Sequence, residues 1–259
     1  MIEAKKSLGQ NFITDTSLLK KIAGFLFDPK NKTVIEIGSG PATLTQAILN
    51  REPYEMIAIE KDERTQEILE NLEAKYPIFS YLLTDALKVD ISKFADAKNL
   101  LLIGNLPYNI STVLLTNWLK QGALFSQAIL MFQKEVADRI TASPNTKNYG
   151  RLSVLSQALC STKILMILPP HVFHPAPKIH SALVEFIPNH SFEKTEIQRL
   201  NLLSTLAFAN RRKKVIKNIS KLFNNVEEIF TKYNLDTNFR AEDLTVEQFI
   251  LLMKEMKND

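Results

Sequence analysis

The tetrapeptide Asn105-Leu106-Pro107-Tyr108 has the residue types that a site for modifying an aromatic amine needs. The nitrogen of such an amine is a poor nucleophile because its lone pair is delocalised into the ring, so an enzyme must localise that pair with hydrogen-bond acceptors. The Asn105 side-chain oxygen and a backbone carbonyl of the Pro-restricted segment supply acceptors, and the Tyr108 ring offers a face for stacking. The tetrapeptide therefore predicts methyl transfer to an exocyclic amine such as adenine N6. A turn after a buried strand is the alternative interpretation.

A glycine turn and two carboxylates precede the tetrapeptide. Gly38 and Gly40 directly follow an apolar run, where glycines let the backbone turn tightly and approach a ligand. Glu60 ends the next predicted strand, from which a carboxylate can hold ribose hydroxyls, and Asp85 follows the third, where it can accept from an adenine amine. Singly each carboxylate is better explained as a solvated loop residue, but together they predict a nucleoside-binding site. Because the chain has no P-loop lysine motif, S-adenosylmethionine fits better than a dinucleotide.

The elements that must position these residues are strand-like apolar runs alternating with helical patterns. This alternation predicts an α/β fold with a Rossmann-like, mostly parallel sheet. A helix is predicted over residues 15–27. Two later runs, 163–168 and 181–187, predict an antiparallel pair that closes the sheet, an ending typical of class I methyltransferases. The parallel strands are predicted at 33–37, 55–59, 79–83, 100–103 and 128–132.

The pattern changes to nearly continuous helical periodicity after residue 188. We therefore expect a methyltransferase domain over residues 1–188 and a small all-helical RNA- or ribosome-binding domain over 189–259. The 259 residues, 45% of them hydrophobic, suffice for one large and one small core. The single cysteine, Cys160, has no disulfide partner, and the histidines lack metal-ligand spacing, so no metal is predicted. The absence of a long apolar stretch and of a secretory signal predicts a cytoplasmic protein.

A basic run near the C-terminal end is the strongest indication of a polyanionic partner. The net charge of +4 is only mildly basic, but no Asp or Glu occurs from 197 to 226. On one continuous helix, four of the basic residues would share a face, which predicts contacts with RNA phosphates. A solvated helix face is the alternative. The predicted RNA-binding residues are Arg211, Arg212, Lys213, Lys214, Lys217 and Lys221.

Over almost its whole length, the sequence resembles the small-subunit (16S) ribosomal RNA adenine N6-dimethyltransferase family, the KsgA type. The resemblance rests on segments that match in the same order along the chain. One departure is Ala42, where a third glycine is frequent, and we expect a slightly altered turn there. The matching segments are 7–12, 36–40, 44–45, 59–60, 85–86, 104–112, 133–136, 143–153, 173–181 and 207–213.

The resemblance implies S-adenosylmethionine as the cofactor, with Asn11 and Ile13 closing over it. Gly38 would approach its methionine part, Glu60 would bind the ribose and Asp85 the adenine. Gly40 and Asn105 complete the predicted cofactor-binding set.

For the target, the resemblance implies that Asn105 and the backbone around Leu106 and Pro107 engage the amine, while Tyr108 and Phe173 sandwich the base. The implied substrate is a pair of adjacent adenosines near the 3′ end of small-subunit ribosomal RNA, in an assembling particle. The implied product is N6,N6-dimethyladenosine. We expect the protein to be a monomer, although the sequence does not give the oligomeric state.

Two other functions fit parts of the sequence. One is a large-subunit ribosomal RNA methylase of the kind that confers antibiotic resistance, but those relatives usually carry isoleucine where this chain has Leu106, and segment 145–153 resembles the ribosome-assembly type. The other is a catalytically silent RNA-binding assembly or transcription factor. The intact Asn105, Pro107, Tyr108, Glu60 and Asp85 argue against that function.

Overall fold

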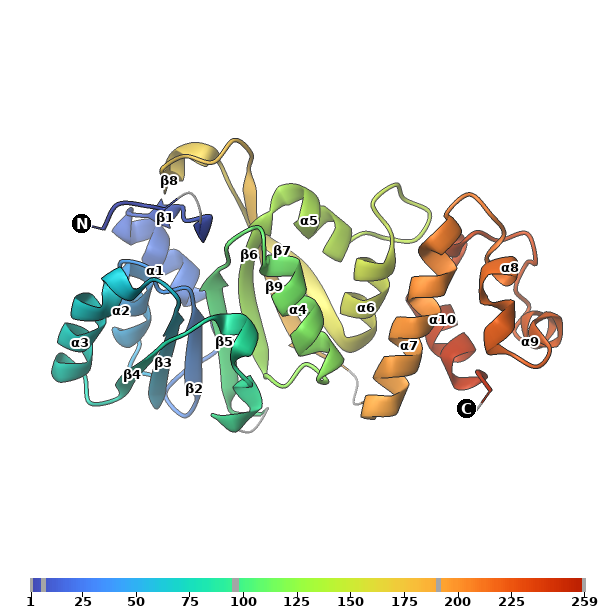
Figure 1. The fold of residues 1–259 in the computed structure, drawn as a ribbon, viewed down its shortest axis with the longest axis horizontal. Helices are drawn as coiled ribbons and strands as arrows, with labels where there is room; N and C mark the ends of the chain where they lie inside the picture. The colour runs from blue at the N-terminus through green and yellow to red at the C-terminus, as the bar shows by residue number, and fades with distance from the viewer. Residues whose placement is uncertain (1, 6–7, 95–97, 190–191, 258–259) are drawn as a thin grey trace. The chain divides into compact units, whose positions relative to one another are not determined.

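The computed structural model describes residues 2–5, 8–94, 98–189 and 192–257, and it contains a seven-stranded sheet of order β4-β3-β2-β5-β6-β9-β7 (Figure 1). Neighbouring strands from β4 to β6 are parallel, and β9 pairs antiparallel with β6. The predicted α/β class, with a mostly parallel sheet and an antiparallel last strand, is confirmed. The strands are β2 Thr33–Ile37, β3 Glu55–Glu60, β4 Phe79–Leu83, β5 Leu100–Asn105, β6 Gln127–Gln133, β7 Cys160–Leu168 and β9 Ser181–Pro188.

The central strands β2 and β5 are buried along almost their whole length, as expected for parallel strands covered on both faces. Helix α1 (Thr16–Gly24) begins after Asp15, whose carboxylate accepts hydrogen bonds from the N–H groups of Ser17 and Leu18. It packs against α2. The other helices before β7 are α2 Thr43–Leu49, α3 Gln66–Lys75, α4 Ser111–Lys120, α5 Lys134–Ile140 and α6 Arg151–Leu159.

The turn from β2 into α2 depends on left-handed backbone conformations. Gly38, Gly40 and Ala42 all have positive φ. A Cβ at Gly40 would lie 2.6 Å from the Phe12 ring, so this position requires glycine. Ala42 (φ 59°) takes the left-handed conformation without being glycine, and a left-handed alanine costs roughly 1–2 kcal/mol. The turn therefore carries some backbone strain at Ala42, and the slightly altered turn stays a prediction.

A second, two-stranded sheet joins the N-terminal segment to a distant loop. Strand β1 (Phe12–Ile13) pairs antiparallel with β8 (Phe173–His174), so that Ile13 lies opposite Phe173. Both residues are buried. This small sheet brings the segment that starts the chain beside the loop between β7 and β9.

The chain divides into two compact units. The first comprises Met1–Leu115, Leu124–Ala137 and Lys163–Ile187, and the second comprises Thr116–Ala123, Asp138–Thr162 and Pro188–Asp259. Within the second, α7 packs against α6, α8 and α10, and the Phe208 ring stacks on Phe249. The predicted assignment of methyl transfer to residues 1–188 and of RNA or ribosome binding to residues 189–259 stays a prediction. The helices after residue 188 are α7 Lys194–Ala207, α8 Val215–Ile219, α9 Val226–Lys232 and α10 Val246–Lys254.

The basic run does not form the single helical stripe that its spacing predicts. Residues 211–214 form a turn, and α8 begins only at Val215, whose N–H donates to the carbonyl of Phe239 instead of to a preceding turn of helix. The helical prediction was wrong because this tertiary hydrogen bond and the turn before it replace the local helical pattern. In the described part of the chain, no helix is both long and apolar enough to cross a membrane.

Candidate active site

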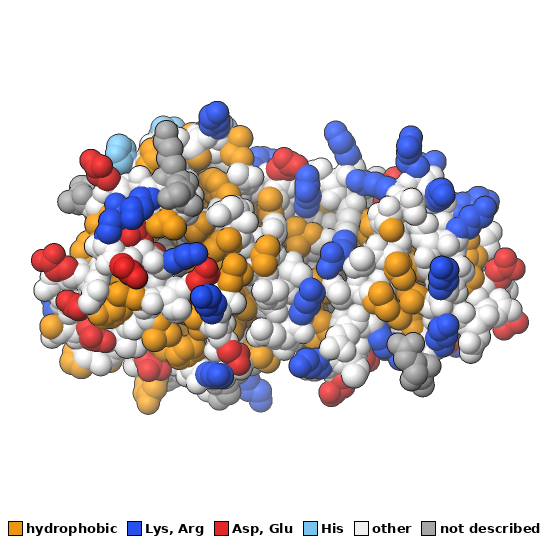
Figure 2. Space-filling view, viewed as in Figure 1, with side chains coloured by type: hydrophobic (Ala, Val, Ile, Leu, Met, Phe, Trp, Pro, Cys, Tyr) orange, Lys and Arg blue, Asp and Glu red, His pale blue; other side chains and the backbone are white. Residues whose placement is uncertain are grey.

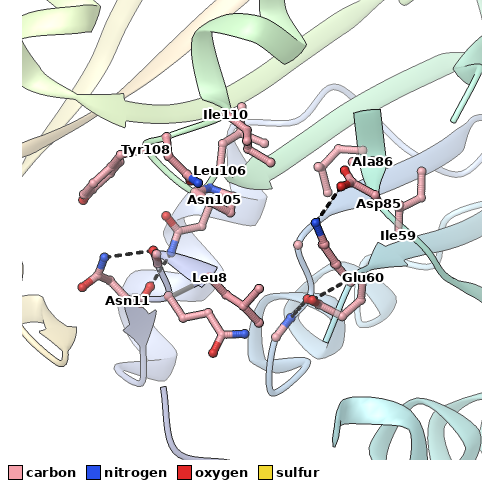
Figure 3. Close-up of a pocket in the computed structure, with 18 of the residues that line it drawn as sticks. Leu8, Asn11, Ile59, Glu60, Asp85, Ala86, Asn105, Leu106, Tyr108 and Ile110 are labelled. Carbon is pink, nitrogen blue, oxygen red and sulfur yellow. Dashed lines mark hydrogen bonds and ion pairs between the residues drawn. The ribbon is translucent and has the colours of Figure 1, made fainter. Parts of the chain in front are cut away.

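A pocket lies at the carboxyl ends of β2 to β5, where the loops that follow parallel strands meet (Figure 3). Glu60 and Asp85 lie on one side of it, and Asn105 and Tyr108 lie on the other. Most of the residues predicted from the sequence are thus brought together. The predicted residues that line the pocket are Asn11, Gly38, Gly40, Glu60, Asp85, Asn105, Leu106, Pro107 and Tyr108.

Glu60 ties the glycine turn to the loop after β3. Its Oε2 accepts a hydrogen bond from Gly40 N–H at 2.8 Å, and its Oε1 accepts from the N–H groups of Lys61 and Asp62 at 2.7 and 2.8 Å. A carboxylate has about four acceptor positions. These contacts hold the buried side chain in place and leave one position on Oε2 for a ligand hydroxyl.

Asp85 is paired with a lysine that the sequence did not single out. Its Oδ2 lies 2.7 Å from Lys61 Nζ, and its Oδ1 accepts from Leu87 N–H at 3.0 Å. The hydrogen bond from Lys61, followed by that from the Leu87 backbone, lowers the pKa of Asp85. Nothing in the local sequence distinguishes Lys61 from other exposed lysines, because the ion pair joins two loops.

Asn105 is oriented by the N-terminal segment. Its Nδ2 donates to the backbone carbonyl of Asn11 at 2.7 Å, which leaves Oδ1 as the acceptor end of the amide. The Pro107 carbonyl accepts from the N–H groups of Ile110 and Ser111, both at 3.1 Å, at the start of α4. These two bonds use the lone pairs of that carbonyl. Of the two predicted backbone acceptors, Leu106 and Pro107, the Pro107 oxygen is therefore already engaged.

Tyr108 and Phe173 differ in their access to the pocket. The Tyr108 hydroxyl lies 2.6 Å from Ser181 Oγ, and burial raises the pKa of Tyr108. Phe173 is 4% exposed in the hydrophobic core and is not among the residues that line the pocket. Ile13 lines a smaller neighbouring cavity. The pairing of Tyr108 with Phe173 around a base stays a prediction.

Glu36 is a buried carboxylate that the prediction missed. It is 1% exposed on β2 and lines the smaller cavity, and Thr45 Oγ1 donates to its Oε2 at 2.6 Å. Burial raises the pKa of Glu36 to about 7, against the hydrogen bond from Thr45, and the nearby Glu60 raises it further. An acidic residue inside an otherwise apolar strand was the available signal, because such residues are rarely buried without a specific environment.

The ribosomal RNA adenine dimethylase family model matches residues 1–258. The chain belongs to this family. Ribosomal RNA small subunit methyltransferase A of Ehrlichia chaffeensis is 38% identical over 254 residues, covering 96% of this chain and 95% of the relative. The protein of the same name from Anaplasma phagocytophilum is 40% identical over 255 residues, covering 98% and 94%.

Solved structures agree with this family assignment. A dimethyladenosine transferase from Plasmodium falciparum superposes with a TM-score of 0.76 at 25% identity, covering 94% of this chain and 96% of the other. The 23S rRNA methyltransferase ErmE has a TM-score of 0.72 at 20% identity, covering 95% and 99%, and it supports the fold alone. This adenine dimethylase is thus an enzyme with a class I methyltransferase fold that uses S-adenosylmethionine to dimethylate adenine in ribosomal RNA.

The pocket residues fit that cofactor. Glu60 and Asp85 present carboxylates suited to a ribose and an adenine amine, both on one side of the pocket. At Gly38 an added Cβ would lie 3.7 Å from Asn105 O, in ordinary van der Waals contact, so the glycine turn lies close to Asn105 on the floor of the pocket that both residues line. When bound, the cofactor supplies an electrophilic methyl group on a sulfonium.

Proposed function

We propose that this enzyme transfers methyl groups from S-adenosylmethionine to N6 of two adjacent adenosines near the 3′ end of small-subunit ribosomal RNA. The substrate is the assembling small subunit, the product is N6,N6-dimethyladenosine, and the role is ribosome biogenesis in the cytoplasm by a monomer. The observation that carries the proposal is the Asn105 amide, which the Asn11 carbonyl orients inside a pocket that also holds Glu60 and Asp85. The names of the curated relatives support the small subunit as target.

The two carboxylates would hold the nucleoside of the cofactor. Glu60 Oε2 has one acceptor position left for a ribose hydroxyl. Asp85 would accept from the adenine amine, in competition with Lys61 Nζ. Backbone N–H groups of the loops after β3 and β4 already hold the two carboxylates. The side chains therefore need little reorganisation when the cofactor binds.

The glycine turn and the N-terminal segment would hold the methionine part. Gly38 and Gly40 let the backbone approach it. Asn11 would cover the cofactor from the N-terminal segment, and Ile13 would contact it from the neighbouring cavity. Asn105 lines both spaces, and its amide would lie between the cofactor and the target base.

The target amine would donate its two N–H groups to Asn105 Oδ1 and to the carbonyl of Leu106, since the Pro107 carbonyl is engaged by α4. These bonds localise the lone pair toward the methyl group, and in-line displacement then depends on positioning more than on a strong base. The amine loses its proton after attack, because alkylation makes it acidic. Tyr108 would stack on the base, with Phe173 on the opposite face. Such access requires a base that is extruded or unpaired.

The basic residues of the second unit would contact RNA phosphates, although not all equally. Arg211 is engaged within the protein: its Nε donates to Glu242 Oε2 at 2.5 Å and its Nη2 to the Lys147 carbonyl at 2.7 Å. Lys214 Nζ donates to Asn238 Oδ1 at 2.5 Å. Lys and Arg side chains gather over the C-terminal helices (Figure 2). The exposed residues that we propose as the main phosphate contacts are Arg212, Lys213, Lys217 and Lys221.

The test is methyl transfer from labelled S-adenosylmethionine to small ribosomal subunits that lack the modification, with large subunits as the control and nucleoside mass spectrometry as the readout. Dimethyladenosine confined to two adjacent positions near the 3′ end of the small-subunit RNA is the expected result. Modification of the large subunit would select the resistance-type function instead. Tight particle binding with no transfer would indicate a factor that has lost its chemistry.

A further inference from the structure

A hydrogen-bonded network outside the predicted site ties the N-terminal segment to the loop after β3. Gln10 Nε2 donates to Asp62 Oδ2 at 2.9 Å, and Gln10 Oε1 accepts from the backbone N–H of Lys5 at 2.8 Å. Asp62 is only 3% exposed. The side-chain amide of Gln10 thus bridges a buried carboxylate and the backbone of the chain's first residues.

Arg64 completes this network from the solvent side. Its Nε and Nη2 donate to the two oxygens of Asp62 at 2.9 and 2.6 Å, and its Nη1 donates to the carbonyl of Glu3 at 3.0 Å. The side-chain hydrogen bonds from Arg64 are the largest cause that holds the pKa of Asp62 well below its usual range, with the bond from Gln10 adding to it. Asp62 is therefore ionised at neutral pH, and its bonds to Arg64 and Gln10 have the strength of bonds to a charged group. Arg64 does not line the pocket.

The network reaches two residues of the proposed site. The N–H of Asp62 donates to Glu60 Oε1 at 2.8 Å, beside the proposed ribose contact. Gln10 is followed directly by Asn11, whose carbonyl receives the Asn105 amide at 2.7 Å. Both Gln10 and Asn11 line the pocket. A single set of contacts thus joins the proposed ribose-binding carboxylate to the proposed amine acceptor through the N-terminal segment.

We propose that Arg64 and Asp62 are positioning residues that latch the N-terminal segment, through Gln10, over bound S-adenosylmethionine and keep the Asn105 amide oriented. This inference rests on the proposed roles of Glu60 and Asn105. The cofactor leaves and enters when the latch opens, so the network sets the rate of cofactor exchange between the two methylations. A weakened latch should speed cofactor release and raise the KM for S-adenosylmethionine, and it should lower kcat because the Asn105 amide loses the orientation that Asn11 gives it.

The test compares Arg64→Ala, Gln10→Ala and the double variant, in the full chain and without RNA. Cofactor affinity by calorimetry and dissociation rate by stopped-flow fluorescence are measured for each. Each single variant should weaken binding about tenfold, mainly through faster dissociation, because a hydrogen bond to a charged group contributes on that scale. The double variant should be no weaker than the worse single variant, because both changes open one latch. Wild-type affinity and dissociation rate in Arg64→Ala, or single effects that multiply in the double variant, would overturn the proposal.

Two controls separate the latch from a general loss of stability. Glu52→Gln removes an exposed ion pair with Lys30 in the same unit and should leave cofactor binding unchanged. Arg64→Lys keeps a cation beside Asp62 but lacks the planar fork that binds both oxygens, so it should give an intermediate dissociation rate. If Arg64→Ala does not fold, Gln10→Ala and Arg64→Lys carry the test.

Amide hydrogen exchange separates local opening of the N-terminal segment from a general loss of stability. Exchange of peptides from the N-terminal segment should rise in Arg64→Ala, whereas peptides from β2 and β5 stay protected. Equal exchange in the variant and the wild type would contradict the latch. Because no RNA is involved, a latch that behaves as expected in an enzyme that fails to modify small subunits would show that only the proposed target is wrong.

Discussion

The side-chain amide of Asn105 donates a hydrogen bond to the backbone carbonyl of Asn11 across 2.7 Å. A primary amide has a donor end and an acceptor end, so committing the donor end to Asn11 presents the oxygen for the target amine. The orientation of the proposed acceptor therefore depends on a segment far away in the sequence.

Replacement of this acceptor should separate chemistry from cofactor binding. Asn105→Ala is expected to lower kcat roughly 100-fold or more, the scale found when one transition-state hydrogen bond is removed. Cofactor affinity should change little, because Glu60 and Asp85 remain in place. Single-turnover methylation of small subunits and calorimetry with S-adenosylmethionine measure the two effects. Near-normal turnover would show that another group localises the lone pair.

Removal of Lys61 should strengthen cofactor binding. Lys61 Nζ occupies Asp85 Oδ2, the proposed acceptor for the adenine amine, and the lysine side chain is 59% exposed. An ion pair this exposed contributes at most about 1 kcal/mol, so Lys61→Ala should tighten binding up to about fivefold. The gain should shrink at high salt, because salt already weakens the pair. Calorimetry with S-adenosylmethionine at two ionic strengths measures the affinity of the variant and of the wild type. Weaker binding by the variant would mean that Lys61 itself contacts the cofactor.

Glu36 should make the stability of the protein depend on pH. Burial raises its pKa from 4.5 to about 7 in the folded protein, so the folded state keeps a proton that the unfolded state loses. As pH rises from about 4.5 to about 7, the free energy of unfolding should therefore fall by about 3 kcal/mol because of this group. Above about pH 7 this contribution should level off. The two other groups that shift the pKa of Glu36 are Thr45 and Glu60. Both remain in Glu36→Gln, so this variant removes only the titrating carboxyl.

Urea unfolding of wild type and Glu36→Gln at pH 5 and pH 8 measures this contribution. The stability of Glu36→Gln relative to the wild type should increase between the two pH values. A constant difference would show that Glu36 is ionised throughout this range.

Charge reversal in the basic set should weaken RNA binding and its dependence on salt. Lys217 is exposed on α8, and we expect Lys217→Glu to lower affinity for small subunits and to reduce the slope of log affinity against log salt by about 1. Lys20→Glu on α1 makes the same change in net charge outside the basic set and serves as the matched control. Equal slopes for the two variants would identify Lys217 as solvated surface without an RNA contact.

The sequence alone determined the sheet and most of the pocket. Apolar runs of strand length identified β2 to β6, and the α/β alternation implied that they lie parallel. Because parallel strands end at one edge of a sheet, residues that follow successive strands must converge there. The sequence alone therefore places Glu60, Asp85 and Asn105 in one site.

The tertiary structure alone decided which partner each side chain meets. Asp85 pairs with Lys61, Arg211 donates to Glu242 and to the 146–149 loop, and Phe173 is buried beside the N-terminal strand. Local pattern had predicted a helical stripe through Arg211, and the turn at 211–214 replaced it. Hydrophobic periodicity reports which face of an element is buried, but a hydrogen bond or ion pair depends on atoms that distant segments bring within about 3 Å, and only the folded packing sets those distances.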